Sequence, residues 1–291
     1  MKASPSVLSL IVAFGLLAVP ASAEQPVVDD RVLRVEDGGS VRQYTVEELV
    51  AAVGLVELGI AQDPHFGPQR VFTGFALQPL LDHIGLDDAS ELLLVCTDGY
   101  RIAFDASVLS QPHLRGLLAI RDTALPADGE THWKPYEHGD ETVSFDPFYL
   151  VWASTDDDAD LGTETLPWPF QLTEIHRFDR RAYFAPARPP ADAGDALQEG
   201  FKVYATHCGK CHRMRGVGGK VGPILDREQS LSALFTTAQL RDYVRHDSSL
   251  YPQSKMPPFA KLLSAAEIDQ VVAYLQAMQP RRSDSTGIPP K

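Results

Sequence analysis

The sequence has few cysteines, no long apolar run beyond its first residues, and few basic residues in its first two thirds. Its 291 residues include only three cysteines, which excludes a disulfide-rich scaffold. Residues 24–190 carry 12 basic and 29 acidic side chains, a net charge of −17. Because a nucleic-acid-binding protein needs a dominant basic face, this composition excludes that class of partner.

The N-terminus has the features of an export signal. Lys2 precedes an uncharged apolar run over residues 7–19, and the small residues Ala21-Ser22-Ala23 follow it. This order predicts a signal peptide over residues 1–23 and a mature chain in the periplasm. The alternative is an uncleaved membrane anchor, but the run has 13 residues and a bilayer core requires about 20. No later stretch is apolar for long enough, so we expect no membrane span in the mature chain.

The charge balance divides the mature chain into two parts. Residues 191–291 carry 13 basic and 10 acidic side chains, a net charge of +3. The change falls at "PARPPADAG", residues 186–194, a composition typical of a linker. We therefore expect domains at residues 24–185 and 195–280, joined by this linker and followed by a tail at residues 281–291.

The first domain shows a mixed pattern. Thr45 and Glu48 in "YTVEELVAAV" form the capping box of a helix, and "FALQPLLDHIG" predicts a helix that ends at Gly85. The stretch "ELLLVCTDGYRIAF" predicts two strands joined by a tight turn at Asp98-Gly99. Further strands are expected in "GLLAIRD", "DPFYLVWAS" and "PFQLTEIHRF". The pattern indicates an α+β domain.

The second domain is predicted to be all-α. "DALQEGFKVYATHC" and "TTAQLRDYVRH" have helical spacing, the latter with Thr236 and Gln239 as caps. In "SAAEIDQVVAYLQAM", Ser264 and Glu267 form a capping box ahead of a regular apolar stripe.

The stretch "HCGKCHRMRG" carries the strongest chemical signal. Cys208, Cys211 and His212 spell C-x-x-C-H, the attachment signature of one covalent haem c. A zinc site would need further cysteines in this domain, and there are none. A redox dithiol would lie at the start of a helix, whereas this motif follows one. We expect two thioether bonds and His212 as an axial ligand of the iron.

The second axial ligand must come from later in the chain. Met256 lies in the Pro-rich "KMPPF", just before the last predicted helix, where a thioether would raise the reduction potential. Met256 is therefore the predicted ligand. His246 is the rival, Met214 and Met278 are weaker candidates, and an open site or a Met256 that only fills the core remain alternatives.

Residues 195–279 resemble class I cytochrome c domains. The shared features are Gly200-Phe201, CGKCH, Gly222-Pro223 in "VGGKVGPIL", KMPPF and Tyr274-Leu275. The resemblance implies that the first and last helices cross at Gly200 and an aromatic residue. It also implies that Gly222 and Pro223 belong to the haem pocket and support His212.

Residues 72–109 resemble the molybdopterin-binding domain of sulfite oxidase-type enzymes. The stretch is "FTGFALQPLLDHIGLDDASELLLVCTDGYRIAFDASVL", and "LPWPFQLTEIHRF" resembles the closing strands of that family. In the family a cysteine upstream of this stretch holds molybdenum, but residues 24–71 contain no cysteine. The strong negative charge also disfavours an anionic pterin. We therefore expect a domain that has lost molybdopterin.

Other residues of the first domain are assigned structural roles. Cys96 is expected to be a buried, inert thiol, and Trp133, Trp152 and Trp168 core or domain-contact residues. His132, His138 and Asp140 could gather a metal, but their spacing matches no known motif and indicates a solvated cluster. The acidic "STDDDADLG" lacks the pattern of a calcium loop.

The sequence thus predicts an electron carrier with no catalytic residues of its own. Its partner would be a periplasmic dehydrogenase or oxidase, which the acidic first domain would dock. The haem edge is expected within a ring of basic residues, namely Lys210, Arg213, Arg215, Lys220, Lys255 and Lys261. The alternatives are a molybdenum oxidoreductase that passes electrons to its own haem, and a haem sensor with a displaceable Met256.

Overall fold

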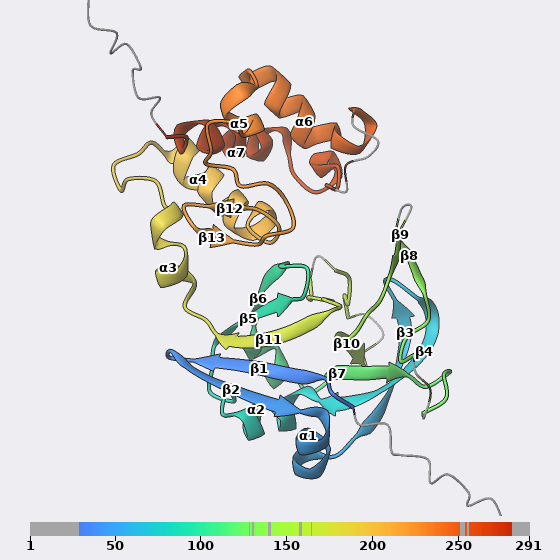
Figure 1. Cartoon of the computed structure of the whole chain (residues 1–291). Helices are drawn as coiled ribbons and strands as arrows, with labels where there is room; N and C mark the ends of the chain where they lie inside the picture. The colour runs from blue at the N-terminus through green and yellow to red at the C-terminus, as the bar shows by residue number, and fades with distance from the viewer. Residues whose placement is uncertain are drawn as a thin grey trace, which may run out of the picture.

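The computed structural model describes residues 29–127, 129, 131–138, 141–156, 159–163, 165–250, 254 and 256–280. The predicted signal peptide and C-terminal tail, Asp140 and Lys255 lie outside these residues. Figure 1 shows two parts, an α+β part in blue to yellow and a helical part in orange to red. The two-part architecture predicted from the sequence is confirmed at this level.

Two sheets form the α+β part, and both contribute to one core. A five-stranded sheet has the order β2-β1-β11-β5-β6, and a four-stranded sheet has the order β10-β7-β4-β3. Among the described strands of these two sheets, β1 and β11 form a parallel pair and all other neighbours are antiparallel. The strands are β1 Val32–Asp37, β2 Ser40–Thr45, β3 Val56–Asp63, β4 Gly67–Ala76, β5 Glu91–Cys96, β6 Arg101–Asp105, β7 Leu114–Asp122, β10 Tyr149–Ser154 and β11 Leu172–Arg177.

Short elements complete this part. The helices are α1 Val46–Val53, α2 Leu77–Ile84, the 3-10 turn η1 Ala106–Ser110, α3 Arg180–Tyr183 and η2 Ala185–Ala187, and a small hairpin pairs β8 Tyr136–His138 with β9 Glu141–Val143. The capping box of Thr45 and Glu48 begins α1, and Gly85 ends α2 in the left-handed conformation, as predicted.

The three tryptophans are buried in the α+β core, as expected. Trp152 is fully buried, and its indole N–H donates to the carbonyl oxygen of Pro167 at 2.6 Å. Cys96 is also buried, and burial raises the pKa of its thiol far above the ordinary value. The thiol is therefore neutral, which agrees with the inert role predicted for it.

The helical part is built on one close helix crossing. A β-carbon on Gly200 would lie 2.1 Å from the backbone oxygen of Gln270, so only glycine allows this approach. Phe201 packs against Tyr274 beside the crossing. The elements are α4 Asp195–Val203, the π-helical η3 Tyr204–Cys208, β12 Arg213–Met214, β13 Val217–Gly218, α5 Leu231–Leu234, α6 Thr237–Leu250, η4 Phe259–Lys261 and α7 Ala265–Ala277.

The two parts share a second hydrophobic cluster. Leu93 and Val95 of β5 pack in it together with Phe184 and with Tyr204 of the helical part. Ala187, within the segment expected to be a linker, is fully buried and accepts a hydrogen bond from the Tyr274 hydroxyl at 2.6 Å. The chain that joins the two parts is therefore packed at its start. No helix among the described residues is long and apolar enough to cross a membrane.

Candidate haem site

One cavity gathers every site residue predicted from the sequence. It has a volume of about 450 Å³ and lies in the helical part, a size within the usual range of ligand pockets. Cys208, Cys211, His212, Gly222, Pro223 and Met256 all line it. They come from three separate segments of the chain, so the fold itself brings them together.

The two cysteines lie on one turn. The amides of Cys211 and His212 both donate to the carbonyl oxygen of Cys208, at 3.1 and 2.9 Å. Burial raises the pKa of the Cys208 thiol to about 12 and that of the Cys211 thiol to about 11. Reactive redox dithiols have lowered pKa values, so this environment is unlike theirs.

His212 is held by the loop that follows it. Its Nδ1–H donates to the carbonyl oxygen of Pro223 at 2.8 Å, which puts the lone pair of the ring on Nε2. Gly222 lies against the ring, where an added β-carbon would be 2.2 Å from Cε1. Gly222 and Pro223 therefore orient the imidazole, in the way that the resemblance implies.

Met256 lies on the cavity wall, and the other candidates do not. Met214 and Met278 are buried in the hydrophobic cluster, and neither is among the described residues that line the cavity. His246 is exposed at a kink of α6, where φ is −138°. The backbone N–H of Met256 donates to the Ser254 hydroxyl at 3.2 Å.

The donor set and the walls fit a haem c. Two cysteine sulfurs, an oriented imidazole and a thioether line a mainly apolar cavity, and apolar walls exclude water from such a group. The apolar walls include Ile224, Leu225, Leu231, Leu240, Val244, Phe259, Leu262 and Leu275.

The α+β part contributes to this cavity, which the sequence did not predict. Tyr100 and Thr163 line it alongside the residues of the helical part. The turn between β5 and β6 is fixed to the CGKCH loop by two backbone hydrogen bonds, from Arg101 N–H to Lys210 O and from Lys220 N–H to Gly99 O, both 2.9 Å. The Asp98-Gly99 signal predicted the turn but gave no indication of what the turn contacts.

The expected basic ring is partly exposed to solvent. Lys210 is half-buried, and Lys220 is exposed although its backbone N–H donates to the α+β part. Arg215 and Lys261 are exposed, and Arg213 is half-buried. Exposed apolar side chains of Val221 and Leu262 also lie at the cavity, 48% and 41% accessible.

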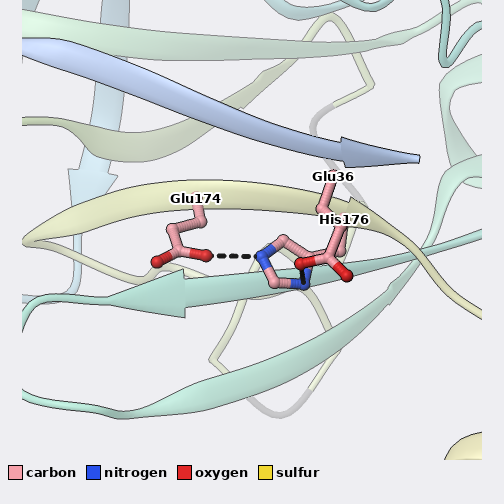
Figure 2. Close-up of side chains that lie close together, drawn as sticks. All are labelled: Glu36, Glu174 and His176. Carbon is pink, nitrogen blue, oxygen red and sulfur yellow. Dashed lines mark hydrogen bonds and ion pairs between the residues drawn. The ribbon is translucent and has the colours of Figure 1, made fainter. Parts of the chain in front are cut away.

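A second group of side chains could hold a metal ion, on the five-stranded sheet. Glu174 and His176 lie on one face of β11, and Glu36 is the register partner of His176 on β1. Figure 2 shows the imidazole between the two carboxylates, with Nε2 2.6 Å from Glu174 Oε2 and Nδ1 3.6 Å from Glu36 Oε2. The i, i+2 spacing of Glu174 and His176 was a signal in the sequence, but Glu36 is too distant along the chain to be associated with them.

The group of His132, His138 and Asp140 lies partly outside the described residues, since Asp140 and the side chain of His138 are not among them. His132 pairs with Asp146, with Nδ1 3.0 Å from Oδ1.

Comparisons with known proteins concern the helical part. Residues 195–275 match the family described as cytochrome C oxidase, cbb3-type, subunit III. Dihydro-heme d1 dehydrogenase of Pseudomonas aeruginosa is 41% identical over 91 residues, which cover 31% of this chain and 17% of that protein. The solved structure of SoxXA from P. pantotrophus matches at 23% identity and a TM-score of 0.27, over 31% of this chain and 85% of that chain.

These matches support a cytochrome c domain at residues 195–275. A domain of this kind implies a haem c and electron transfer. The matched stretch is about a sixth of the length of the curated relative. The likeness of the α+β part to sulfite oxidase-type enzymes remains a prediction.

Proposed function

We propose that the chain is a periplasmic mono-haem c-type cytochrome that carries electrons between partner proteins. Cys208 and Cys211 would hold the haem covalently, with His212 and Met256 as axial ligands of the iron. The observation that carries this proposal is that all six residues predicted for the site line one apolar cavity.

The residues of the chain supply what an electron carrier needs. A haem c bound in the cavity would exchange one electron at a time. The hydrogen bond from His212 to Pro223 keeps the imidazole in one orientation and makes it a better donor. Pro257 and Pro258 stiffen the chain directly after Met256, so the thioether would keep its position when the charge of the iron changes.

The acidic α+β domain is proposed to dock a partner with a basic surface. Its net charge of −17 over residues 24–190 would attract such a partner from a distance and speed the encounter. The exposed Val221 and Leu262 at the haem cavity offer the apolar contact across which electrons would pass. The partner would be a periplasmic dehydrogenase or oxidase.

The α+β domain is proposed to resemble the molybdopterin domain in fold and to have lost the cofactor. Cys96 is the one cysteine of this domain, and it lies buried on β5 with a thiol that burial keeps protonated. Metal ligation requires a thiolate, so Cys96 is a poor substitute for the missing molybdenum ligand. The molybdenum oxidoreductase is therefore the weaker alternative.

A redox titration followed by absorbance tests the proposed function. The protein, matured with its haem, should show a single reversible one-electron wave and a low-spin spectrum in both oxidation states. Elemental analysis of the same sample should give one iron and no molybdenum per chain. A two-electron wave, or stoichiometric molybdenum, would replace the proposal with the oxidoreductase.

A further inference from the structure

A second cavity adjoins the haem cavity from the side of the α+β domain. Its volume is about 210 Å³, and Tyr100 and Thr163 line both cavities. The two residues form the wall between them. A small molecule in the smaller cavity would therefore lie next to the haem site without entering it.

Aromatic rings and one carboxylate dominate the lining of this second cavity. Tyr100, Trp168, Phe170 and the imidazole of His65 contribute rings, Asp98 contributes the carboxylate, and no lysine or arginine is among the described lining residues. Aromatic faces attract cations through the ring quadrupole, and cages of such rings recognise alkylated ammonium groups. A nearby carboxylate strengthens that preference.

The walls are held in place before any ligand arrives. The indole N–H of Trp168 donates to the carbonyl oxygen of Leu161 at 2.8 Å, and Phe170 stacks on Phe145 with ring centroids 4.4 Å apart. Asp98 accepts the backbone N–H of Tyr100 at 2.8 Å. A preorganised cavity loses little entropy on binding, which favours even a small ligand.

The charge of the surroundings selects the same class of ligand. Residues 24–190 carry a net charge of −17 and so attract cations over a distance, while Lys210 and Lys220 of the helical part lie beside the turn that carries Asp98. A neutral aromatic molecule would gain from the rings but not from the field or from Asp98. An organic cation gains from all three.

We propose that this cavity is a binding site for a small alkylammonium ion, placed against the haem site through Tyr100 and Thr163. The volume suits a ligand of a few heavy atoms, below the size of a drug-like molecule. A positive charge bound behind this wall favours the reduced, less positive iron. Binding would therefore raise the reduction potential, and reduction would in turn tighten binding.

Calorimetry on the full-length haem-loaded protein tests the proposal, with trimethylammonium as the probe and tert-butanol as an uncharged control of similar size. We expect saturable binding of trimethylammonium at one site and at least ten-fold weaker binding of tert-butanol. Equal affinity for the two probes, or no binding of the cation, would overturn the proposal.

Two variants and a control locate the site. Asp98→Asn keeps an acceptor for the Tyr100 amide and removes the charge, and should weaken binding about three- to ten-fold. Thr163→Lys places a cation at the exposed edge of the shared wall and should abolish binding. Glu57→Gln removes an equal charge on β3, outside the lining, and should leave binding unchanged. Binding that is as strong in Asp98→Asn and Thr163→Lys as in the control would place the cation elsewhere and contradict the proposal.

Discussion

At the scale of single residues, the haem site depends on how closely Gly222 approaches His212. The absent β-carbon leaves room for the imidazole, and the neighbouring Pro223 accepts its Nδ1–H. The side chain of residue 222 therefore decides where the ring can lie. That these residues belong to one site was predictable from the sequence, because the C-x-x-C-H spacing identifies three of the residues that line the cavity.

Gly222→Ala should push the His212 ring out of position. The new β-carbon would lie 2.2 Å from Cε1, so the loop must move, and overpacking of this kind costs about 1–3 kcal/mol of the free energy of unfolding. We expect a lower melting temperature and a shifted reduction potential. Gly194→Ala is the matched control, since nothing lies within 4 Å of its β-carbon position. Equal effects of the two changes would show that Gly222 has no particular role.

Met256→Ala should leave the iron with one protein axial ligand. The reduction potential should fall, and carbon monoxide or cyanide should bind readily, which absorbance spectra would show. Met278→Leu is a control, because Met278 is buried away from the cavity and leucine conserves its volume. An unchanged low-spin spectrum of Met256→Ala would assign the ligand to another residue, with His246 as the first to test.

At the scale of secondary-structure elements, the hairpin of β5 and β6 connects the two parts of the chain. Gly99 at its turn has a φ of +89°, and an added β-carbon would lie 2.7 Å from Cβ of Lys220. Glycine is required there both by the backbone conformation and by the contact. The turn thus serves as a wall of the haem cavity as well as a connection between strands.

Gly99→Val should separate this turn from the CGKCH loop. The amides of Arg101 and Lys220, which donate across the contact, should then exchange their hydrogens faster, as measured by hydrogen–deuterium exchange. Gly59→Val on β3 is the control, because its β-carbon position is open and its φ is not positive. If both amides are as well protected from exchange as in the control, the turn does not hold the loop.

The elements that the sequence predicted are those with local signals. Both capping boxes, the Gly85 stop and the Asp98-Gly99 turn were confirmed, because each depends on residues within a few positions. The strands β1 to β4 were not predicted, although β1 pairs with the adjacent β2 and β3 with the adjacent β4. The parallel pairing of β1 with β11 had no local signal, because β11 lies far along the chain. The contribution of Tyr100 and Thr163 to the haem cavity was missed for the same reason.

At the scale of the whole molecule, charge is distributed unevenly between the two parts of the chain. Residues 24–190 carry the acidic charge, and the part with the candidate haem site is weakly basic, with a net charge of +3 over residues 191–291. The hydrophobic cluster shared by the two parts holds them together. The acidic surface proposed for docking is thus attached to the candidate haem site.

Reversing charges on the α+β domain should slow the encounter with a basic partner. One variant combines three changes of exposed acidic side chains on this domain, Glu47→Lys, Glu57→Lys and Asp87→Lys. The control combines two changes of exposed acidic side chains on the helical part, Glu228→Lys and Asp242→Lys. We expect the rate of reduction by the physiological donor to fall several-fold for the first set, with a weaker dependence on ionic strength, because exposed charges are screened beyond about 8 Å at physiological salt. Stopped-flow reduction across a salt series measures this. An unchanged salt slope would rule out acidic docking.

The expectations for the reduction potential, the axial ligand and the electron-transfer rate require that the chain carries a covalent haem at the CGKCH motif. Intact-mass spectrometry of the denatured protein, produced with haem attachment outside the cytoplasm, measures this for the wild type and for Cys208→Ala/Cys211→Ala. We expect the wild-type mass to exceed that of the polypeptide by one haem, and the double variant to have the mass of the polypeptide alone. A wild-type chain without the added haem, or a double variant that retains it, would contradict the assignment of this site.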